Sequence, residues 1–404
     1  MIKAFIVVTV FLYPLIVLAT KIKIITHNQM GIWAHGINDN DVDNYYLAIV
    51  KNYFDAVGDA DVIIFNFQEL MELKVDKAVD QVKLFNKNKS NSKSTSTSTS
   101  TSNSTDTENV SKNSNLLLTN VHARLLKYFK NDKYNCTYII EYYMATIVCV
   151  DKSITNFTVN KYADKFFNGK FQNVRFTNGF FGQKGGMITS ITLNGKLILN
   201  TNVHLDSKDS KARQTQFKFL YNSCKDKREM VKKTNYRSIF IFAGDFNQRS
   251  TEAQKKKYKK DMIDGQIKPS KIFENKNEGE MKDTIISEYG LDEKIIRFIP
   301  TYKINSWTFG KKKIKFSQIK DSDDISGYYK DGKASYTDRI LIDKKLNDFK
   351  YTIDEYTILD LDSVLSDHLP VVATITIQDF KDNRKAKRTE KYLAIKDAES
   401  RLII

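Results

Sequence analysis

Cysteine is scarce in this chain, whose 404 residues include 3 cysteines, at positions 136, 149 and 224. So few thiols cannot build a disulfide framework, and at most one pair can form, which would leave one thiol free. Serine, cysteine and histidine also do not form the sequence pattern of a covalent mechanism, because no cysteine lies close to the histidine-containing polar stretches. A covalent nucleophilic enzyme is therefore not indicated.

An apolar run of the full length that a membrane-spanning helix usually needs is missing as well. Residues 1–20, MIKAFIVVTVFLYPLIVLAT, start with a basic residue, continue with an apolar run and end with small residues at the spacing of a cleavage site. This pattern predicts a secretory signal peptide. A spanning helix usually needs about 20 apolar residues, so an uncleaved membrane anchor is the less favoured alternative. We expect a protein of the secretory pathway, or a secreted one.

Acidic residues are outnumbered: 64 Lys and Arg against 48 Asp and Glu give a net charge of +16. Such a charge favours an anionic partner, for example an anionic membrane surface. General compositional bias stays an alternative, because the basic runs at 255–260, 311–315 and 384–388 are dispersed along the chain.

Residues 86–115 consist almost entirely of Ser, Thr, Asn and charged residues. Such a segment has little to bury and cannot offset its own ordering entropy, so it is predicted to be a disordered insertion. It interrupts one catalytic domain, expected over 21–378. A basic tail follows at 379–404.

Strand-like and helix-like patterns alternate along this domain, which predicts a layered α/β protein. Strands are expected at 21–28, 61–70, 136–151, 185–205, 238–247, 336–342 and 370–377. Helices are expected at 43–57, 115–129 and 210–224.

Short polar clusters accompany almost every expected strand. They are His27-Asn28, Gln68-Glu69, Asn202-Val203-His204, Asp245-Phe246-Asn247, Asp338-Arg339 and Ser366-Asp367-His368. Each alone fits a turn or a helix cap, but six together indicate a site. Mg²⁺ prefers hard oxygen ligands, a carboxylate can take a proton from water, and two histidines can bind phosphate oxygens. Hydrolysis of a phosphate ester by metal-activated water is therefore favoured.

The order of these motifs resembles the endonuclease/exonuclease/phosphatase superfamily over residues 21–378. Three further stretches resemble the inositol polyphosphate 5-phosphatases: FGQKGGM at 181–187, PTYK at 300–303 and ASYTDRIL at 334–341. The resemblance implies a DNase I-like fold, that is, a four-layer α/β sandwich in which two mainly antiparallel sheets pack face to face with flanking helices.

The resemblance also implies roles for individual residues. Asn28, Glu69 and Asp367 would hold Mg²⁺, and Asp245 would orient or deprotonate the attacking water.

The scissile phosphate would be bound by His204, Asn247 and His368. Asp338 would fix the tautomer of His368 and favour its charged form.

A second group of residues would bind the other phosphates of the substrate. Tyr302, Lys303 and Arg339 would hold the neighbouring ring phosphate, and Lys184 would lie by the others. Some positions depart from the family pattern, which makes fine specificity less secure than reaction type: Gln183, Ala334, Tyr336 and Thr337.

The sequence thus predicts a Mg²⁺-dependent hydrolase that removes the 5-phosphate from phosphoinositides such as the 4,5-bisphosphate, or from soluble inositol polyphosphates. We expect a monomer that does not bind nucleic acid. The alternatives are a secreted Mg²⁺-dependent nuclease and a sphingomyelinase-like phosphodiesterase of the same superfamily. From another class, a catalytically inactive lipid-binding module is also an alternative, which the complete set of metal-binding and base residues disfavours.

Overall fold

A computed structural model describes most of the expected domain. The described residues are 19–30, 39–70, 121, 123–141, 144–161, 184–207, 209–232, 236–249, 256, 260, 285–304, 329, 334–359 and 366–378. Residues 1–18 of the expected signal peptide, the insertion 86–115 and the tail 379–404 lie outside this part of the chain. Within the described residues, no helix combines the length and the apolar character that crossing a membrane requires.

The first of two six-stranded sheets has the strand order β11-β12-β1-β2-β4-β3. Its central pair, β1 and β2, is parallel, and its other neighbours are antiparallel. The strands are β1 (Thr20–Asn28), β2 (Val62–Gln68), β3 (Tyr134–Glu141), β4 (Met144–Asp151), β11 (Lys350–Ile358) and β12 (Val371–Gln378).

The second sheet repeats this plan with the order β5-β6-β7-β8-β10-β9. Its parallel pair is β7 and β8, and its other neighbours are antiparallel. The strands are β5 (Phe157–Lys161), β6 (Gly185–Leu193), β7 (Lys196–His204), β8 (Arg237–Asp245), β9 (Leu291–Asp292) and β10 (Asp338–Asp343).

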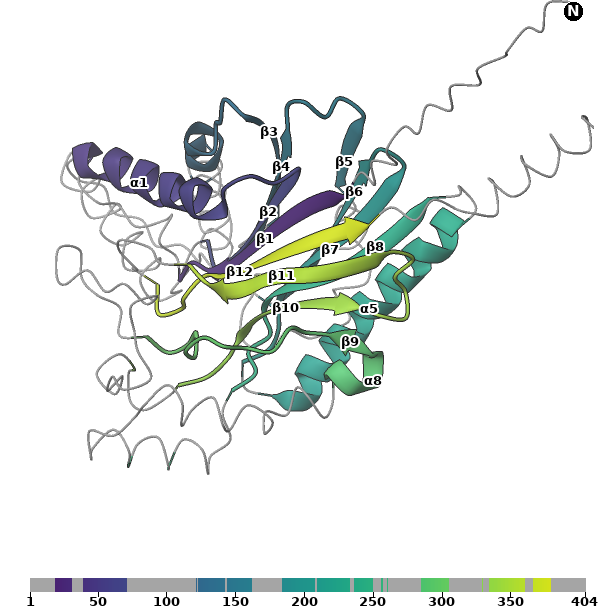
Figure 1. The fold of residues 1–404 in the computed structure, drawn as a ribbon. Helices are drawn as coiled ribbons and strands as arrows, with labels where there is room; N and C mark the ends of the chain where they lie inside the picture. Colours follow the sequence, from purple (N-terminus) through teal and green to yellow (C-terminus); the bar gives the residue numbers. More distant parts are fainter. Residues whose placement is uncertain are drawn as a thin grey trace, which may run out of the picture.

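Each parallel pair is joined by a helix, as a parallel connection requires. Helix α1 (Asp39–Val57) joins β1 to β2, and α5 (Ser210–Lys232) joins β7 to β8. A short helix, α8 (Ser287–Tyr289), precedes β9. Figure 1 shows α1 and α5 on opposite outer sides of the sheets.

Among the described residues, three large apolar clusters and one small one hold the layers together. Strand β2 shows how: Val62 and Ile64 face the second sheet, whereas Ile63 and Phe65 face α1. Because β2 is buried on both faces, its first four residues, 62–65, form a continuous apolar run. Helix α5 packs on the outer face of the second sheet through Phe217 and its neighbours. The four layers, two mainly antiparallel sheets between helices, confirm the predicted fold.

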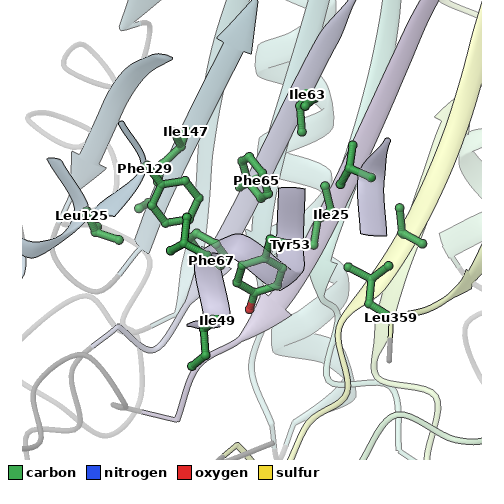
Figure 2. Packing of buried hydrophobic residues seen from close by; sticks show 14 of the residues in the cluster. Ile25, Ile49, Tyr53, Ile63, Phe65, Phe67, Leu125, Phe129, Ile147 and Leu359 are labelled. Carbon is green, nitrogen blue, oxygen red and sulfur yellow. The ribbon is translucent and has the colours of Figure 1, made fainter. Parts of the chain in front are cut away.

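The cluster under α1 is rich in aromatic rings. Figure 2 shows Tyr53 of α1 beside Phe65 and Phe67 of β2. The ring of Tyr53 lies 5.9 Å from that of Phe65 and 5.7 Å from that of Phe67. Such aromatic pairs add to the stabilisation from area burial alone, so α1 is held firmly against the sheet.

Several expected strands differ in detail. The segments 136–151 and 185–205, each expected as one strand, are hairpins made by β3 with β4 and by β6 with β7. Asn194 and Gly195 form the second turn with φ of 47° and 79°, as a tight hairpin turn requires. The edge strands β5 and β11 and the short β9 were not predicted, because charged and polar residues interrupt their apolar pattern.

Cys136 and Cys149 face each other across the β3–β4 hairpin and form a disulfide. Cys224 is buried and free. One pair and one free thiol is the limit that the sequence predicted.

Candidate active site

The predicted polar clusters meet at one edge of the two packed sheets. In each parallel pair the carboxyl ends lie together, so Asn28 pairs with Gln68 in register, and His204 pairs with Asp245. The antiparallel neighbour β10 begins at the same edge, where Asp338 pairs with Asp245. Topology therefore brings together residues that are far apart in the sequence.

Gly244 allows β7 and β8 to approach closely beside Asp245. Its φ is 155°, and a Cβ atom there would lie 1.9 Å from the carbonyl oxygen of Val203. A side chain at this position would push the two strands apart, since that separation is far below van der Waals contact. The glycine before Asp245 is thus needed to place His204 and Asp245 in one row.

Asp245 is the centre of the group. Its Oδ2 atom accepts hydrogen bonds from Asn28 Nδ2 and Asn247 Nδ2, both at 3.0 Å, and its Oδ1 atom accepts one from the backbone N of Asn247 at 2.7 Å. His204 Nε2 lies 3.5 Å from Oδ2. The carboxylate is buried. Its position and orientation are fixed by these donors.

His368 and Asp338 form a buried pair, with 2.9 Å between His368 Nδ1 and Asp338 Oδ2. The same oxygen accepts hydrogen bonds from Thr301 and Thr337. Burial lowers the pKa of His368, but the charge of Asp338, aided by other nearby carboxylates, outweighs burial and raises the pKa to about 10. The imidazole is therefore protonated at neutral pH.

Glu69 is the second carboxylate that lies close to His204, besides Asp245. Its Oε1 atom is 3.2 Å from His204 Nε2 and 3.4 Å from Lys184 Nζ. Burial raises the pKa of Glu69, but His204 and Lys184 outweigh burial and hold the pKa well below its usual range. The carboxylate is ionised. Its backbone φ of 50° is unusual for a glutamate, and such strain is frequent at functional sites.

Asp367 completes the acidic residues of the site, with its Oδ1 atom 3.7 Å from His368 Nε2. Burial raises the pKa of this carboxyl, and the charge of Glu69 adds to the effect, while His368 and Lys303 oppose it. Lys303 thus lies close enough to Asp367 to act on it electrostatically.

Tyr302 lies against His368, with ring centroids 4.6 Å apart. Arg249, which the sequence analysis did not single out, also contacts this tyrosine: its guanidinium carbon is 5.0 Å from the centre of the Tyr302 ring. It also donates to Asn247 Oδ1 at 3.3 Å. Its position two residues after Asn247 is the feature of the sequence that could have identified Arg249 as a site residue.

Arg339 is the predicted site residue that the structure does not bring to this group. Its guanidinium forms a partly buried ion pair with Glu293, and the hydroxyl of Tyr356 donates to the same carboxylate. Successive side chains of a strand point to opposite faces. With Asp338 directed at the site, Arg339 is directed elsewhere.

Two sets of residues could hold a metal ion. Asp245, Asp338 and His368 offer ligand atoms within 4.8 Å of one another. A protonated imidazole has no free lone pair, so this trio suits proton chemistry better. Asn28, Glu69 and Asp367 offer oxygen atoms, the ligands that Mg²⁺ prefers, and the ionised state of Glu69 fits a cation.

Residues 26–374 match the family model described as Endonuclease/Exonuclease/phosphatase family 2. Among solved structures, the chain is similar to a Cimex nitrophorin, with 15% identity, a TM-score of 0.47 and coverage of 89% of this chain and 99% of that one. It is also similar to the inositol polyphosphate 5-phosphatase domain of SpSynaptojanin, with 15% identity, a TM-score of 0.46 and coverage of 94% and 93%. Caenorhabditis elegans TDP2 is a further similar structure, with 14% identity, a TM-score of 0.34 and coverage of 89% and 74%. No curated protein matches the sequence. The structural likenesses are too distant to assign a substrate.

Proposed function

Because this chain belongs to the endonuclease/exonuclease/phosphatase family, we propose that it is a Mg²⁺-dependent phosphomonoesterase acting on inositol phosphates. Its reaction is removal of the 5-phosphate from phosphoinositides such as the 4,5-bisphosphate, or from soluble inositol polyphosphates. One observation carries the proposal: a buried carboxylate, Asp245, and a protonated His368–Asp338 pair lie at one edge among several cationic side chains.

Asp245 is proposed to accept the proton of the attacking water. An ionised carboxylate has about four lone-pair sites, and three N–H groups of Asn28 and Asn247 already occupy sites on Asp245. The remaining capacity can hold one water molecule. Fixed neighbours also spare the carboxylate from reorganising during the reaction.

His368 is proposed to bind the scissile phosphate through Nε2–H, since its Nδ1–H is held by Asp338. His204 and Asn247 border the same space, with His204 Nε2 lying 3.5 Å from Asp245. A charged donor stabilises the negative charge that shifts among the phosphate oxygens in the transition state. The positive charge of His368 is maintained by Asp338 for this purpose.

Asn28, Glu69 and Asp367 are proposed to hold the metal ion. When bound, Mg²⁺ would polarise the phosphate and favour deprotonation of water. Asn28 suits this role because its Nδ2 atom donates to Asp245. Its Oδ1 atom accepts a hydrogen bond from the backbone N of Met30 at 3.1 Å and keeps a second lone pair for the cation. Glu69 supplies an ionised oxygen at the same edge.

The substrate is proposed to carry more than one phosphate, because three cations border the group. Lys184 lies by Glu69 and His204, Arg249 lies on Tyr302, and Lys303 acts on Asp367. Lys and Arg form charge-assisted bonds with phosphate oxygens. The presence of three such side chains at the site supports a polyphosphorylated ring over a substrate with a single phosphate.

We further propose that the protein enters the secretory pathway and works at an anionic membrane surface. The signal-like residues 1–20 and the net charge of +16 support this. The Cys136–Cys149 disulfide adds to it, because such bonds persist mainly in oxidising compartments.

The test is release of free phosphate from inositol 1,4,5-trisphosphate and from phosphatidylinositol 4,5-bisphosphate, with Mg²⁺ and with excess chelator. We expect release by the wild type with Mg²⁺ alone, and its loss in Asp245→Asn. Asp354→Asn, the same change on the exposed part of β11, is the matched control and should keep full activity. Full activity in chelator would contradict the metal-dependent mechanism.

A further inference from the structure

His27 is a buried histidine that the proposed reaction does not use. It precedes Asn28 at the end of β1 and is 2% exposed. Its Nε2 atom lies 3.1 Å from the backbone carbonyl oxygen of His368, and its Nδ1 atom lies 2.5 Å from the hydroxyl of Tyr53. A side chain of β1 thus connects the main chain of the phosphate-binding histidine to helix α1.

The partners of His27 determine which ring nitrogen carries its proton. A carbonyl oxygen only accepts, so Nε2 must be the donor toward His368. The side-chain amide nitrogen of Gln29, which only donates, lies 3.0 Å from Nδ1, so Nδ1 must be an acceptor and the ring is neutral. The hydroxyl of Tyr53 can donate to Nδ1, and the amide of Gln29 donates to that hydroxyl at 3.0 Å. The hydrogen bonds therefore run in one direction, from Gln29 through Tyr53 and His27 to His368.

The backbone groups of Asp367 and Leu369 bond to other backbone groups, whereas those of His368 bond to side chains. Residues 301–304 pair with this segment through the carbonyl oxygen of Asp367 and the backbone N of Leu369. The backbone N and O of His368 itself point to side chains instead: N donates to Ser366 Oγ, and O accepts from His27. Ser366 in turn donates to the carbonyl oxygen of Asn28 at 2.6 Å. His27 is thus the partner that ties the His368 carbonyl to β1.

Tyr53 is well placed to hold His27 because the ring of Tyr53 is fully buried and closely packed. The ring is buried among Phe65 and Phe67 (Figure 2), while its hydroxyl reaches the end of β1. The distance between the His27 and Tyr53 ring centroids is 6.2 Å, in an edge arrangement. A rigid donor of this kind preserves one tautomer of His27.

We propose that His27 is a positioning residue for His368: its Nε2–H fixes the main chain of His368, and Tyr53 and Gln29 keep that proton on Nε2. The inference rests on the proposed function in so far as the affected reaction is phosphate hydrolysis. Displacing a phosphate-binding group by a fraction of an ångström lowers turnover more than ground-state binding, because the group acts mainly on the transition state.

Two amide variants separate positioning from bulk. The amide nitrogen of glutamine reaches the place of His Nε2, whereas that of asparagine reaches only the place of Nδ1. His27→Asn should lower kcat about tenfold to a hundredfold and leave KM almost unchanged, because it cannot donate to His368. His27→Gln should recover most of kcat. Wild-type kcat in His27→Asn, or equal loss of kcat in both variants at equal melting temperature, would overturn the proposal.

A measurement on the wild type keeps the proposal testable if either variant fails to fold. In protein labelled with ¹⁵N in the histidine rings, two-bond ¹H–¹⁵N spectra at neutral pH should show His27 protonated on Nε2 and bare on Nδ1. A proton on Nδ1, alone or with one on Nε2, would overturn the proposal. If the wild type hydrolyses no phosphomonoester, the proposed function fails, and this spectrum still tests the role of His27.

Discussion

Replacing Asp338 with asparagine removes the charge that keeps His368 protonated. Asp338 Oδ2 receives Nδ1–H of His368 at 2.9 Å and two threonine hydroxyls, Thr301 and Thr337, at 2.7 and 2.9 Å. The amide of Asp338→Asn would keep the shape but not the charge, so His368 loses a hydrogen bond to a charged group, a kind of bond worth about 1.5 to 3 kcal/mol. If this loss falls on the transition state, kcat drops about tenfold to a hundredfold.

The assay is steady-state phosphate release by Asp338→Asn, normalised to folded protein, beside a control on the same strand. Asp343 at the far end of β10 is also buried and accepts backbone hydrogen bonds from Lys345 and Leu346. Asp343→Asn should lower the free energy of unfolding by about 1 to 3 kcal/mol and leave kcat per folded molecule unchanged. A wild-type kcat in Asp338→Asn, or an equal loss of kcat in both variants, would refute this account of His368.

Three further outcomes are expected. Lys303→Ala should erase most of the preference for a 4,5-bisphosphate over a 5-monophosphate, while the exposed Lys218→Ala should keep it; an unchanged preference in Lys303→Ala would show that Lys303 does not read the second phosphate. Deletion of 88–113 should leave kcat and the melting temperature nearly unchanged, because closure entropy varies slowly with loop length; calorimetry showing a large drop would mean that the tract is structured. Binding to vesicles should increase with anionic lipid and decrease with salt; a co-sedimentation assay that finds no salt dependence would point to insertion of an apolar segment.

Much of the fold could be predicted because its central strands are buried on both faces. Most of strand β2 and of strand β8 reads as an apolar run in the sequence. Edge strands lack such an apolar run, so this pattern does not predict them. Strand β11, KYTIDEYTI, contains charged residues and alternates exposed with partly buried positions over most of its length, a pattern that periodicity alone does not separate from a loop.

The candidate site could be predicted as a set of residues but not as a set of contacts. Polar residues after buried strands are conspicuous, and parallel pairing brings them together at one edge. Contacts depend on register and on which face a side chain takes, and this is why Arg339, one residue after Asp338, pairs with Glu293 instead. The link between Tyr53 and His27 could not be foreseen either, because it needs the packing of α1 on the sheet.

The measurement that tests the central claim most directly is the product of the wild-type reaction with Mg²⁺. Phosphatidylinositol 4,5-bisphosphate, inositol 1,4,5-trisphosphate, DNA, RNA and sphingomyelin are each incubated with the enzyme, and free phosphate and cleaved diester are quantified. The proposed function predicts free phosphate from the two inositol phosphates, with the 5-position dephosphorylated, and no cleavage of the three diesters. Efficient cleavage of DNA without release of phosphate would contradict the proposed function and favour the nuclease.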